Sequence, residues 1–229
     1  MNQDAIFSEG EGDRWFQRNA RALSREEIEK TDPILRALQT VNVRPRRVIE
    51  IGASNGYRLH LLHQLYGCEG TAVEPSEAAI AEGRAKFPHL RFERGVAAAV
   101  PIREDEAFDL VIVNFVLHWV DRATLLRSCA ELDRLLVPGG FLIIGDFHPP
   151  RPQKVRYHHR TDLELFTYKQ NYAEIFLATR LYTQFSAVLT DTHHVSGPDV
   201  PPQDRVQVAV LKKTGEEGYE TREFLPPTP

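Results

Sequence analysis

Two acidic residues and two glycines, Glu50, Gly52, Gly56 and Glu74, have the spacing of a nucleotide-binding site. The glycines interrupt a short apolar run that ends at Ile51, and glycine lets the backbone approach a ligand closely. A helical pattern follows, and the free N–H groups of its first turn would point toward that ligand. Glu74 ends a second apolar run, where a carboxylate can accept hydrogen bonds from both hydroxyls of a ribose. These residues therefore predict a strand–turn–helix–strand unit that binds a nucleotide.

The residues around the turn argue against a dinucleotide as the ligand. A dinucleotide turn has three glycines to pass a pyrophosphate, whereas Ser54 occupies the middle position here. Glu50, two residues before Gly52, would repel a pyrophosphate but suits a cationic ligand that carries an amino-acid group. A NAD-type cofactor is therefore the less favoured alternative.

The stretch Glu50-Ile51-Gly52-Ala53-Ser54-Asn55-Gly56 resembles the first motif of the class I S-adenosylmethionine (SAM) methyltransferases, with Ser54 in place of the usual second glycine. Glu74 matches the ribose-binding acid of this family, and the resemblance continues through about residue 147. Val96 stands where the family usually has an acidic residue that contacts the adenine amino group. The resemblance implies SAM as cofactor and S-adenosylhomocysteine (SAH) as product, bound by Glu50, Gly52, Ala53, Ser54, Asn55, Gly56, Glu74, Pro75, Val96, Ala97, Asn114 and Phe115.

The elements that must position these residues are also visible in the sequence. Residues 108–115 are nearly all apolar, which is typical of a central parallel strand buried on both faces. Asp32, Ser76 and Asp121 are predicted helix caps. Residues 181–195 and 205–213 read as two strands that, by the resemblance, close the sheet as an antiparallel hairpin. We expect an α/β protein, a three-layer Rossmann-like sandwich whose seven-stranded, mostly parallel sheet has an antiparallel last strand.

The length of 229 residues fits one large domain. Residues 1–44 are expected to form an N-terminal helical segment, with a helix from Asp13 to Leu23 and a capping box at residues 24–27. The resemblance makes this segment a lid over the cofactor. Residues 45–215 would be the SAM-binding domain, with residues 148–180 as an insertion on the substrate side. In that insertion the pattern predicts an exposed loop over 148–160 and a helix over 161–179, and residues 216–229 are expected to be a poorly ordered tail.

Composition bounds the partners of the protein. A net charge of -4 gives no support for a nucleic-acid surface, which needs a clustered positive face. The sequence has no apolar run near the ~20 residues of a membrane helix and no signal-peptide pattern at its start. The two cysteines, Cys68 and Cys129, read as reduced thiols of a cytoplasmic protein. We expect a small-molecule substrate and no nucleic-acid or membrane partner; a homodimer is compatible with the sequence, and the oligomeric state stays open.

Two histidines follow the fourth and fifth predicted strands and are the candidate general bases. Ligands of open α/β sheets bind beyond the carboxyl ends of the strands, which is where His118 and His148 are expected. Histidine can take a proton from a hydroxyl near neutral pH, and we prefer His148, with His118 as either the base or a hydrogen-bonded wall residue. A carboxylate acceptor would need no base, and then Arg151, Arg156, His158, His159 or Tyr168 could bind the anion.

Aromatic and polar residues near the same rim are the candidate substrate contacts. They come from the N-terminal segment, from the ends of the strands and from the insertion: Trp15, Phe16, Asn19, Tyr57, Trp119, Asp146, His158, His159, Tyr168 and Tyr172. Aromatic residues at helical spacing are more often packed in a core than exposed to a ligand. Asn114 and Asp146 could offer oxygen ligands to a divalent ion, but the sequence lacks a carboxylate-rich ligand set, so no metal is expected.

The resulting prediction is transfer of a methyl group from SAM to a small molecule, at a hydroxyl or carboxylate oxygen. A natural-product or sugar-type metabolite is the expected class of acceptor. The alternatives are transfer to nitrogen or carbon, and a non-catalytic accessory protein that keeps the fold. The second alternative is disfavoured because a degenerate relative should have lost Glu50, Glu74 and the glycine turn.

Overall fold

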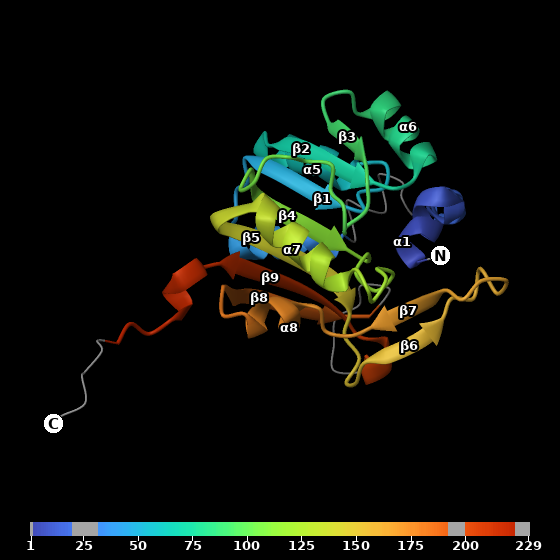
Figure 1. Cartoon of the computed structure of the whole chain (residues 1–229). Helices are drawn as coiled ribbons and strands as arrows, with labels where there is room; N and C mark the ends of the chain where they lie inside the picture. Colours follow the sequence, from blue (N-terminus) through green and yellow to red (C-terminus); the bar gives the residue numbers. More distant parts are fainter. Residues whose placement is uncertain (1, 20–31, 192–199, 223–229) are drawn as a thin grey trace.

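A seven-stranded β-sheet runs through the middle of the protein in the spatial order β3-β2-β1-β4-β5-β9-β8 (Figure 1). The computed structural model describes residues 2–19, 32–191 and 200–222. Strands β1 to β5 are mutually parallel, whereas β9 is antiparallel to both of its neighbours. This confirms the predicted sheet, whose strands are β1 Arg47–Ile51, β2 Glu69–Glu74, β3 Arg91–Arg94, β4 Phe108–Asn114, β5 Leu136–Phe147, β8 Tyr182–Thr190 and β9 Val206–Lys213.

Helices cover both faces of the sheet and produce the three predicted layers. Alternate residues of β4 show this arrangement, since Leu110 and Ile112 pack with α4 and α5, while Val111 and Val113 pack with α7 and α8. All four side chains are buried, as the continuous apolar run predicts. The helices are α4 Pro33–Val41, α5 Tyr57–Tyr66, α6 Glu77–Lys86, α7 Leu125–Leu135 and α8 Ala173–Ala178, with 3-10 turns η2 Pro202–Asp204 and η3 Gly215–Gly218.

Two of the three predicted helix caps are confirmed. The Asp32 carboxylate accepts hydrogen bonds from the backbone N–H groups of Ile34 and Leu35 at 2.9 and 3.0 Å, and so begins α4. Ser76 accepts from the N–H of Ala79 at 3.1 Å and begins α6. The prediction for Asp121 is wrong, because its carboxylate accepts from the N–H of Ala123 in a turn that precedes α7.

The predictions for residues 148–180 are partly wrong. Strands β6 Gln153–Arg156 and β7 Phe166–Lys169 form a separate antiparallel ribbon where a loop and the first half of a helix are expected, and the helix is limited to α8. The Gln3 side chain, far away in sequence, accepts from the Phe166 N–H at 2.7 Å and donates to its carbonyl oxygen at 3.0 Å. A tertiary contact of this kind stabilises extended backbone against a helical pattern, and no local signal reveals it.

The N-terminal segment packs between this ribbon and α6. It comprises α1 Gln3–Ile6, a π-helical turn η1 Phe7–Glu11 and α2 Gly12–Asn19 (Figure 1). Asp13 of α2 accepts from the Ser76 hydroxyl at 2.6 Å and from the Ala78 N–H at 3.1 Å, which ties α2 to the start of α6. The predicted helix is confirmed as far as Asn19; its remainder and the predicted capping box at residues 24–27 lie outside the described residues.

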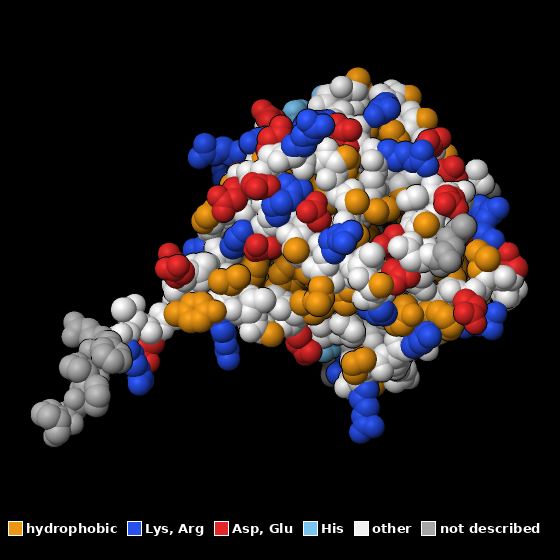
Figure 2. All heavy atoms as spheres, viewed as in Figure 1, with side chains coloured by type: hydrophobic (Ala, Val, Ile, Leu, Met, Phe, Trp, Pro, Cys, Tyr) orange, Lys and Arg blue, Asp and Glu red, His pale blue; other side chains and the backbone are white. Residues whose placement is uncertain are grey.

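The described end of the chain and the surface add two observations. Within the predicted tail, residues up to 222 are described, and the Tyr219 hydroxyl donates to the carbonyl oxygen of Thr179 at 3.0 Å. Acidic and basic side chains are interspersed on the face shown in Figure 2. Over the described ranges, no helix combines the length and the apolar character that a membrane crossing requires.

Close contact between α6 and the glycine turn gives a stability prediction. A Cβ atom at Gly83 would lie 2.7 Å from the carbonyl oxygen of Asn55 and would also clash with the Phe92 ring. We expect Gly83→Ala to destabilise the fold by about 1–3 kcal/mol through overpacking, although alanine is the better helix former. Urea unfolding measures this change. Ala81→Gly on the exposed side of α6 is the control, with a loss of about 1 kcal/mol, and a stabilised Gly83→Ala protein would contradict the packing argument.

Candidate active site

A cavity of about 530 Å³ lies at the carboxyl ends of β1, β2 and β4, under the N-terminal segment. Its size is within the usual range for small-molecule sites. Most of the residues predicted from sequence line it: Trp15, Asn19, Glu50, Gly52, Ala53, Ser54, Asn55, Tyr57, Glu74, Pro75, Val96, Ala97, Asn114, Phe115, His118 and Trp119. The sequence therefore predicts the location of the cavity and most of its wall.

The glycine turn brings the backbone against the floor of the cavity. Gly52 has a φ of 73°, and a Cβ atom there would clash with the side chain of Val116. The N–H groups of Gly52 and Ala53 both donate to the Val73 carbonyl oxygen, at 2.8 and 3.2 Å. Ser54 has a φ of 52°, in the left-handed region that favours glycine. The serine thus keeps the backbone shape that a glycine at this position would adopt.

Glu74 connects the end of β2 to that turn. Its carboxylate oxygens accept from the N–H groups of Ser54 and Ser76, at 2.8 and 2.9 Å. Burial raises the pKa of Glu74 to about 7, against the lowering effect of these two hydrogen bonds. The carboxyl is therefore held in place, and a ligand that donates to it would favour its ionised form.

Glu50 belongs to a buried charged triad. Arg58 of α5 pairs with Glu50 and donates to Asp32 at 2.8 Å. Burial raises the pKa of Glu50 to about 7, the Arg58 charge opposes this rise, and the charge of Asp32 adds to it. The two carboxylates raise the pKa of Arg58. Sequence reasoning missed Arg58. A signal was available, because Arg58 is the only Lys, Arg, Asp or Glu in α5.

Four buried polar atoms in the cavity wall lack a hydrogen-bond partner among the described residues. They are Oε2 of Glu50, Oγ of Ser54, Oδ1 of Asn114 and Nε1 of Trp119. Buried polar atoms in proteins are nearly always hydrogen-bonded. Their concentration in one cavity indicates that a ligand with both donor and acceptor groups completes them.

A histidine and an aspartate form a pair at the β4 and β5 side of the cavity. Nδ1 of His118 lies 2.9 Å from Oδ1 of Asp146, and both side chains are buried. The Asp146 carboxylate also accepts from the backbone N–H groups of His118 and Phe147, at 3.2 and 2.8 Å. An ionised carboxylate only accepts, so Nδ1 is the donor and Nε2 remains as the basic nitrogen. The pair can therefore accept a proton from a ligand.

Eight predicted site residues do not line the cavity. Asp146 stands behind His118, and Tyr172 is buried with its hydroxyl donating to the Tyr168 carbonyl oxygen at 2.5 Å. His158 and His159 are exposed and contact each other, with ring centroids 3.9 Å apart. His148 lies outside the lining, so the preference for it as the base finds no support in this geometry. The remaining residues outside the lining are Gly56, Phe16 and Tyr168.

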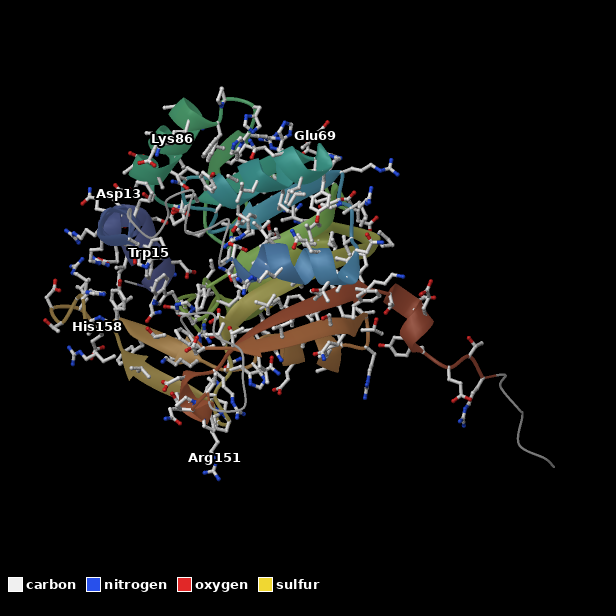
Figure 3. All side chains as sticks on the ribbon, turned by 180° about the vertical axis from the view of Figure 1, so that it is seen from behind. Asp13, Trp15, Glu69, Lys86, Arg151 and His158 are labelled. Atoms are coloured by element: carbon white, nitrogen blue, oxygen red, sulfur yellow. The ribbon has the colours of Figure 1, made fainter. Side chains whose placement is uncertain are left out.

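The cations considered for an anionic acceptor also lie elsewhere. Arg151 and Arg156 are exposed and do not line the cavity, and Figure 3 shows Arg151 pointing away from the body of the protein. The N-terminal segment instead contributes Asp4 and Phe7, which sequence reasoning missed. No pattern near them signals a site, since only the packing of the segment brings them over the sheet.

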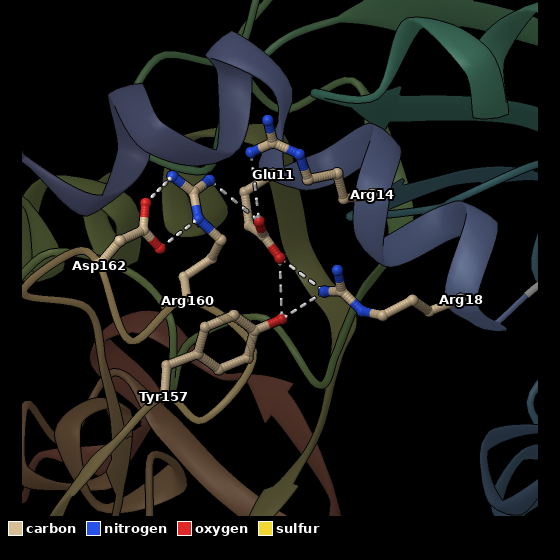
Figure 4. A network of polar contacts seen from close by, with 6 residues as sticks. All are labelled: Glu11, Arg14, Arg18, Tyr157, Arg160 and Asp162. Atoms are coloured by element: carbon tan, nitrogen blue, oxygen red, sulfur yellow. Dashed lines mark hydrogen bonds and ion pairs between the residues drawn. The ribbon is translucent and has the colours of Figure 1, made fainter.

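A buried carboxylate joins the N-terminal segment to the β6–β7 ribbon (Figure 4). The side chain of Glu11 is fully buried and accepts from Arg18 at 2.5 Å and from the Tyr157 hydroxyl at 3.1 Å. Arg160 lies 3.5 Å from its other oxygen. Burial and the Glu11 charge raise the pKa of Tyr157 to about 12, so the phenol stays protonated and continues to donate. The N-terminal segment, from α1 to α2, forms the roof of the cavity, and this network attaches it to the loop that connects β6 with β7.

Comparison with known proteins agrees with the geometry. Residues 48–140 match the family model described as a methyltransferase domain. The chain is 36% identical over 133 residues to malonyl-[acyl-carrier protein] O-methyltransferase of Halorhodospira halophila, covering 56% of this chain and 44% of that protein. It is 33% identical over 120 residues to trans-aconitate 2-methyltransferase of Delftia acidovorans, covering 51% and 44%. The chain thus spans less than half the length of these curated relatives.

Solved structures share the fold at low sequence identity. The 1,6-didemethyltoxoflavin-N1-methyltransferase of Burkholderia thailandensis, solved with SAH, superposes with a TM-score of 0.70 at 16% identity, covering 93% of this chain and 91% of that one. The N-methyltransferase NodS of Bradyrhizobium japonicum, also solved with SAH, gives 0.59 at 18% identity, covering 84% and 90%. The chain therefore has the Rossmann-like fold of these methyltransferase structures, and its residues 48–140 match a methyltransferase-domain model, as the motifs predict.

Removal of the Glu11 carboxylate should loosen the roof of the cavity. Glu11→Ala leaves the Tyr157 hydroxyl without its acceptor and Arg18 without its buried carboxylate partner, although Arg18 still donates to the Tyr157 hydroxyl oxygen, and we expect it to destabilise the contact by about 1–3 kcal/mol. Hydrogen exchange should then rise in residues 3–19 and 153–169 before it rises in β1 and β4. Glu9→Ala, at an exposed position of the same segment, is the control. Equal exchange in the two variants would mean that the network does not hold the segment.

Proposed function

We propose that this protein transfers a methyl group from SAM to an oxygen atom of a small molecule. The observation that carries the proposal is a single cavity with two chemically different ends. One end has the glycine turn, Glu50 and Glu74, and the other has the His118–Asp146 pair. Methyl transfer needs both a donor and an acceptor aligned in one enclosed space.

The residues at the β1–β2 end fit SAM. Glu74 can accept hydrogen bonds from the ribose hydroxyls, and Glu50 has a free buried oxygen for a cationic group. The missing side chain of Gly52 leaves room for Val116, and Ser54 offers a buried hydroxyl without a partner among the described residues. SAM supplies a methyl group on a positively charged sulfur, which is reactive without further activation. The role of these residues is to bind and orient it.

The residues at the β4–β5 end fit an acceptor that must lose a proton. As the oxygen–methyl bond forms and the carbon–sulfur bond breaks, the hydroxyl proton passes to Nε2 of His118. Asp146 holds the imidazole in the tautomer that can accept it and stabilises the charged ring. This assigns the base to His118, which lines the cavity, in preference to His148.

The acceptor atom separates this proposal from its alternatives. Two curated relatives are named malonyl-[acyl-carrier protein] O-methyltransferase and trans-aconitate 2-methyltransferase. Two structural neighbours are named as N-methyltransferases. A histidine base serves a hydroxyl or a protonated nitrogen, whereas a carboxylate needs none. The His118–Asp146 pair at the cavity therefore supports a hydroxyl acceptor over a carboxylate acceptor. An accessory role without catalysis has no observation in its favour.

The domain organisation follows from the same proposal. Residues 1–44 would form a lid, of which the described part covers the cavity. Residues 45–215 would form the SAM-binding domain, and residues 148–180 within it would form an insertion on the substrate side. Trp15 and Asn19 of the lid line the cavity, and the β6–β7 ribbon of the insertion supports the lid. The two elements would open together when a ligand exchanges.

Loss of either carboxyl at the β1–β2 end should weaken cofactor binding. Glu74→Ala removes the proposed ribose acceptor and Glu50→Ala the proposed partner of the cationic group. Each should raise the SAH or SAM dissociation constant about ten- to hundredfold, since a hydrogen bond to a charged group contributes about 1.5–3 kcal/mol. Isothermal titration measures both ligands.

The control for this experiment is Glu69→Ala at the other end of β2, where the side chain is 85% exposed (Figure 3). In the unchanged protein, protonation of the two carboxyls with a pKa of about 7 should weaken SAH binding as the pH falls through 7, by up to about tenfold per pH unit for each group. Unchanged affinity in both alanine variants would remove the assigned site.

Changes in the histidine pair should affect the chemical step alone. We expect His118→Gln to lower kcat about 10²- to 10⁴-fold, because the acceptor proton loses its base, and Asp146→Asn to lower it through a misoriented imidazole. SAH affinity should stay unchanged in both, which isothermal titration verifies. The control is His148→Gln, outside the cavity lining. A large loss with His148→Gln and none with His118→Gln would reverse the assignment of the base.

A further inference from the structure

The acceptor end of the cavity has a continuous aromatic wall. Five lining rings come from three segments that are far apart in sequence: Phe7, Trp15, Phe115, Trp119 and Phe147. Trp119 stacks on Phe7 with ring centroids 5.0 Å apart and meets Trp15 edge-on at 5.9 Å. Phe115 meets Phe147 edge-on at 5.5 Å. Assembly of rings from separate elements around one space is typical of a site for a flat apolar ligand.

The proposed base is part of this wall. The His118 imidazole lies 4.4 Å from the Trp119 ring and 5.0 Å from the Phe147 ring, measured between centroids. Trp119 also carries the buried Nε1 donor that has no partner among the described residues. A ligand that packs on these rings would therefore meet a proton acceptor at His118 and a hydrogen-bond donor at Trp119.

The charges of the described lining favour an uncharged or cationic acceptor over an anion. Four lining residues are acids. Asp32, Glu50 and Glu74 lie at the β1–β2 end, where Arg58 pairs with Asp32 and Glu50, and Asp4 comes from the N-terminal segment. Lys169 lies over the Phe147 ring at 4.3 Å but is not part of the lining. At the acceptor end the described lining holds Asp4 and no Lys or Arg, so a carboxylate buried there would lose its hydration without gaining a cationic partner.

We infer that the methyl acceptor is an uncharged aromatic or heteroaromatic compound with a ring hydroxyl. It would pack against the aromatic wall at Trp119, with its hydroxyl at His118. The inference rests on the proposed function and names its substrate class. The hydroxyl oxygen takes the methyl group of SAM, the carbon–sulfur bond breaks with its electron pair left on sulfur, and the proton goes to Nε2 of His118. The products are the aryl methyl ether, SAH and a proton that His118 then releases to water.

The test uses three probes with the full chain saturated with SAH. 2-Naphthol has a flat ring and a hydroxyl, 2-naphthoate has the same ring with a carboxylate, and adipate has carboxylates without a ring. Isothermal titration should show 2-naphthol binding at least tenfold more tightly than 2-naphthoate, and no binding of adipate. With SAM in place of SAH, 2-naphthol should yield SAH and 2-methoxynaphthalene. Binding of 2-naphthoate or adipate as tight as that of 2-naphthol, or no binding of 2-naphthol, overturns the inference.

Variants locate the probe in the cavity. Trp119→Leu should weaken 2-naphthol binding at least tenfold and leave SAH affinity unchanged, whereas Trp119→Phe should keep most of the affinity because it keeps a ring. Phe185→Leu is the matched control, since Phe185 is an exposed ring on β8, outside the lining. Equal 2-naphthol affinity in Trp119→Leu and Phe185→Leu would overturn the inference. Failure to bind SAH or SAM in the unchanged protein is a separate result, which removes the proposed function itself.

Discussion

The burial of two carboxyls at the ends of β1 and β2 is the constraint on which the site depends. Burial raises the pKa of Glu50 and of Glu74 to about 7, so the folded protein holds protons that the unfolded chain releases between about pH 4.5 and 7. The stability of the ligand-free fold therefore falls as the pH rises through that range. Arg58 and the N–H groups of Ser54 and Ser76 offset part of this cost. A ligand that donates hydrogen bonds to the ionised carboxyls offsets more of this cost. The free energy that the ligand-free protein loses by burying the two carboxyls is therefore linked to its affinity for that ligand.

Local signals explain why the sheet and this end of the cavity could be predicted from sequence. The apolar run of β4 requires burial on both faces, and the turn from Gly52 to Gly56 requires left-handed backbone between a strand and a helix. The helix caps at Asp32 and Ser76 act within three residues of their own position. Once parallel strands are placed side by side, the residues at their carboxyl ends share one rim without any further information.

The opposite end of the cavity depends on contacts that no local pattern contains. Gln3 pairs with Phe166, Glu11 with Tyr157, and His118 with Asp146, at sequence separations of 163, 146 and 28 residues. The contact of Gln3 with Phe166 stabilises β7 where a helix is expected. The contact with Asp146 distinguishes His118 from His148, although both histidines follow the end of a strand. Sequence reasoning therefore found the residues at the β4–β5 end of the cavity as a group, but it preferred His148, which lies outside the lining, and it did not anticipate Phe7 and Asp4.

The N-terminal segment that covers the cavity also contributes two rings to the aromatic wall, and under the proposed function this has a consequence for specificity. Phe7 and Trp15 belong to the N-terminal segment, and their contacts with Trp119 complete the wall only when that segment is packed on the β6–β7 ribbon. Under the proposed function, an acceptor that fits the wall would gain contacts with the N-terminal segment and would favour its packed arrangement, whereas an acceptor that fits poorly would not. Closure would then exclude water and bring the acceptor hydroxyl to His118 in one step. On this proposal, selection of the acceptor and assembly of the catalytic geometry would depend on one packing event, and the contacts of Glu11 with Arg18 and Tyr157 support that packing.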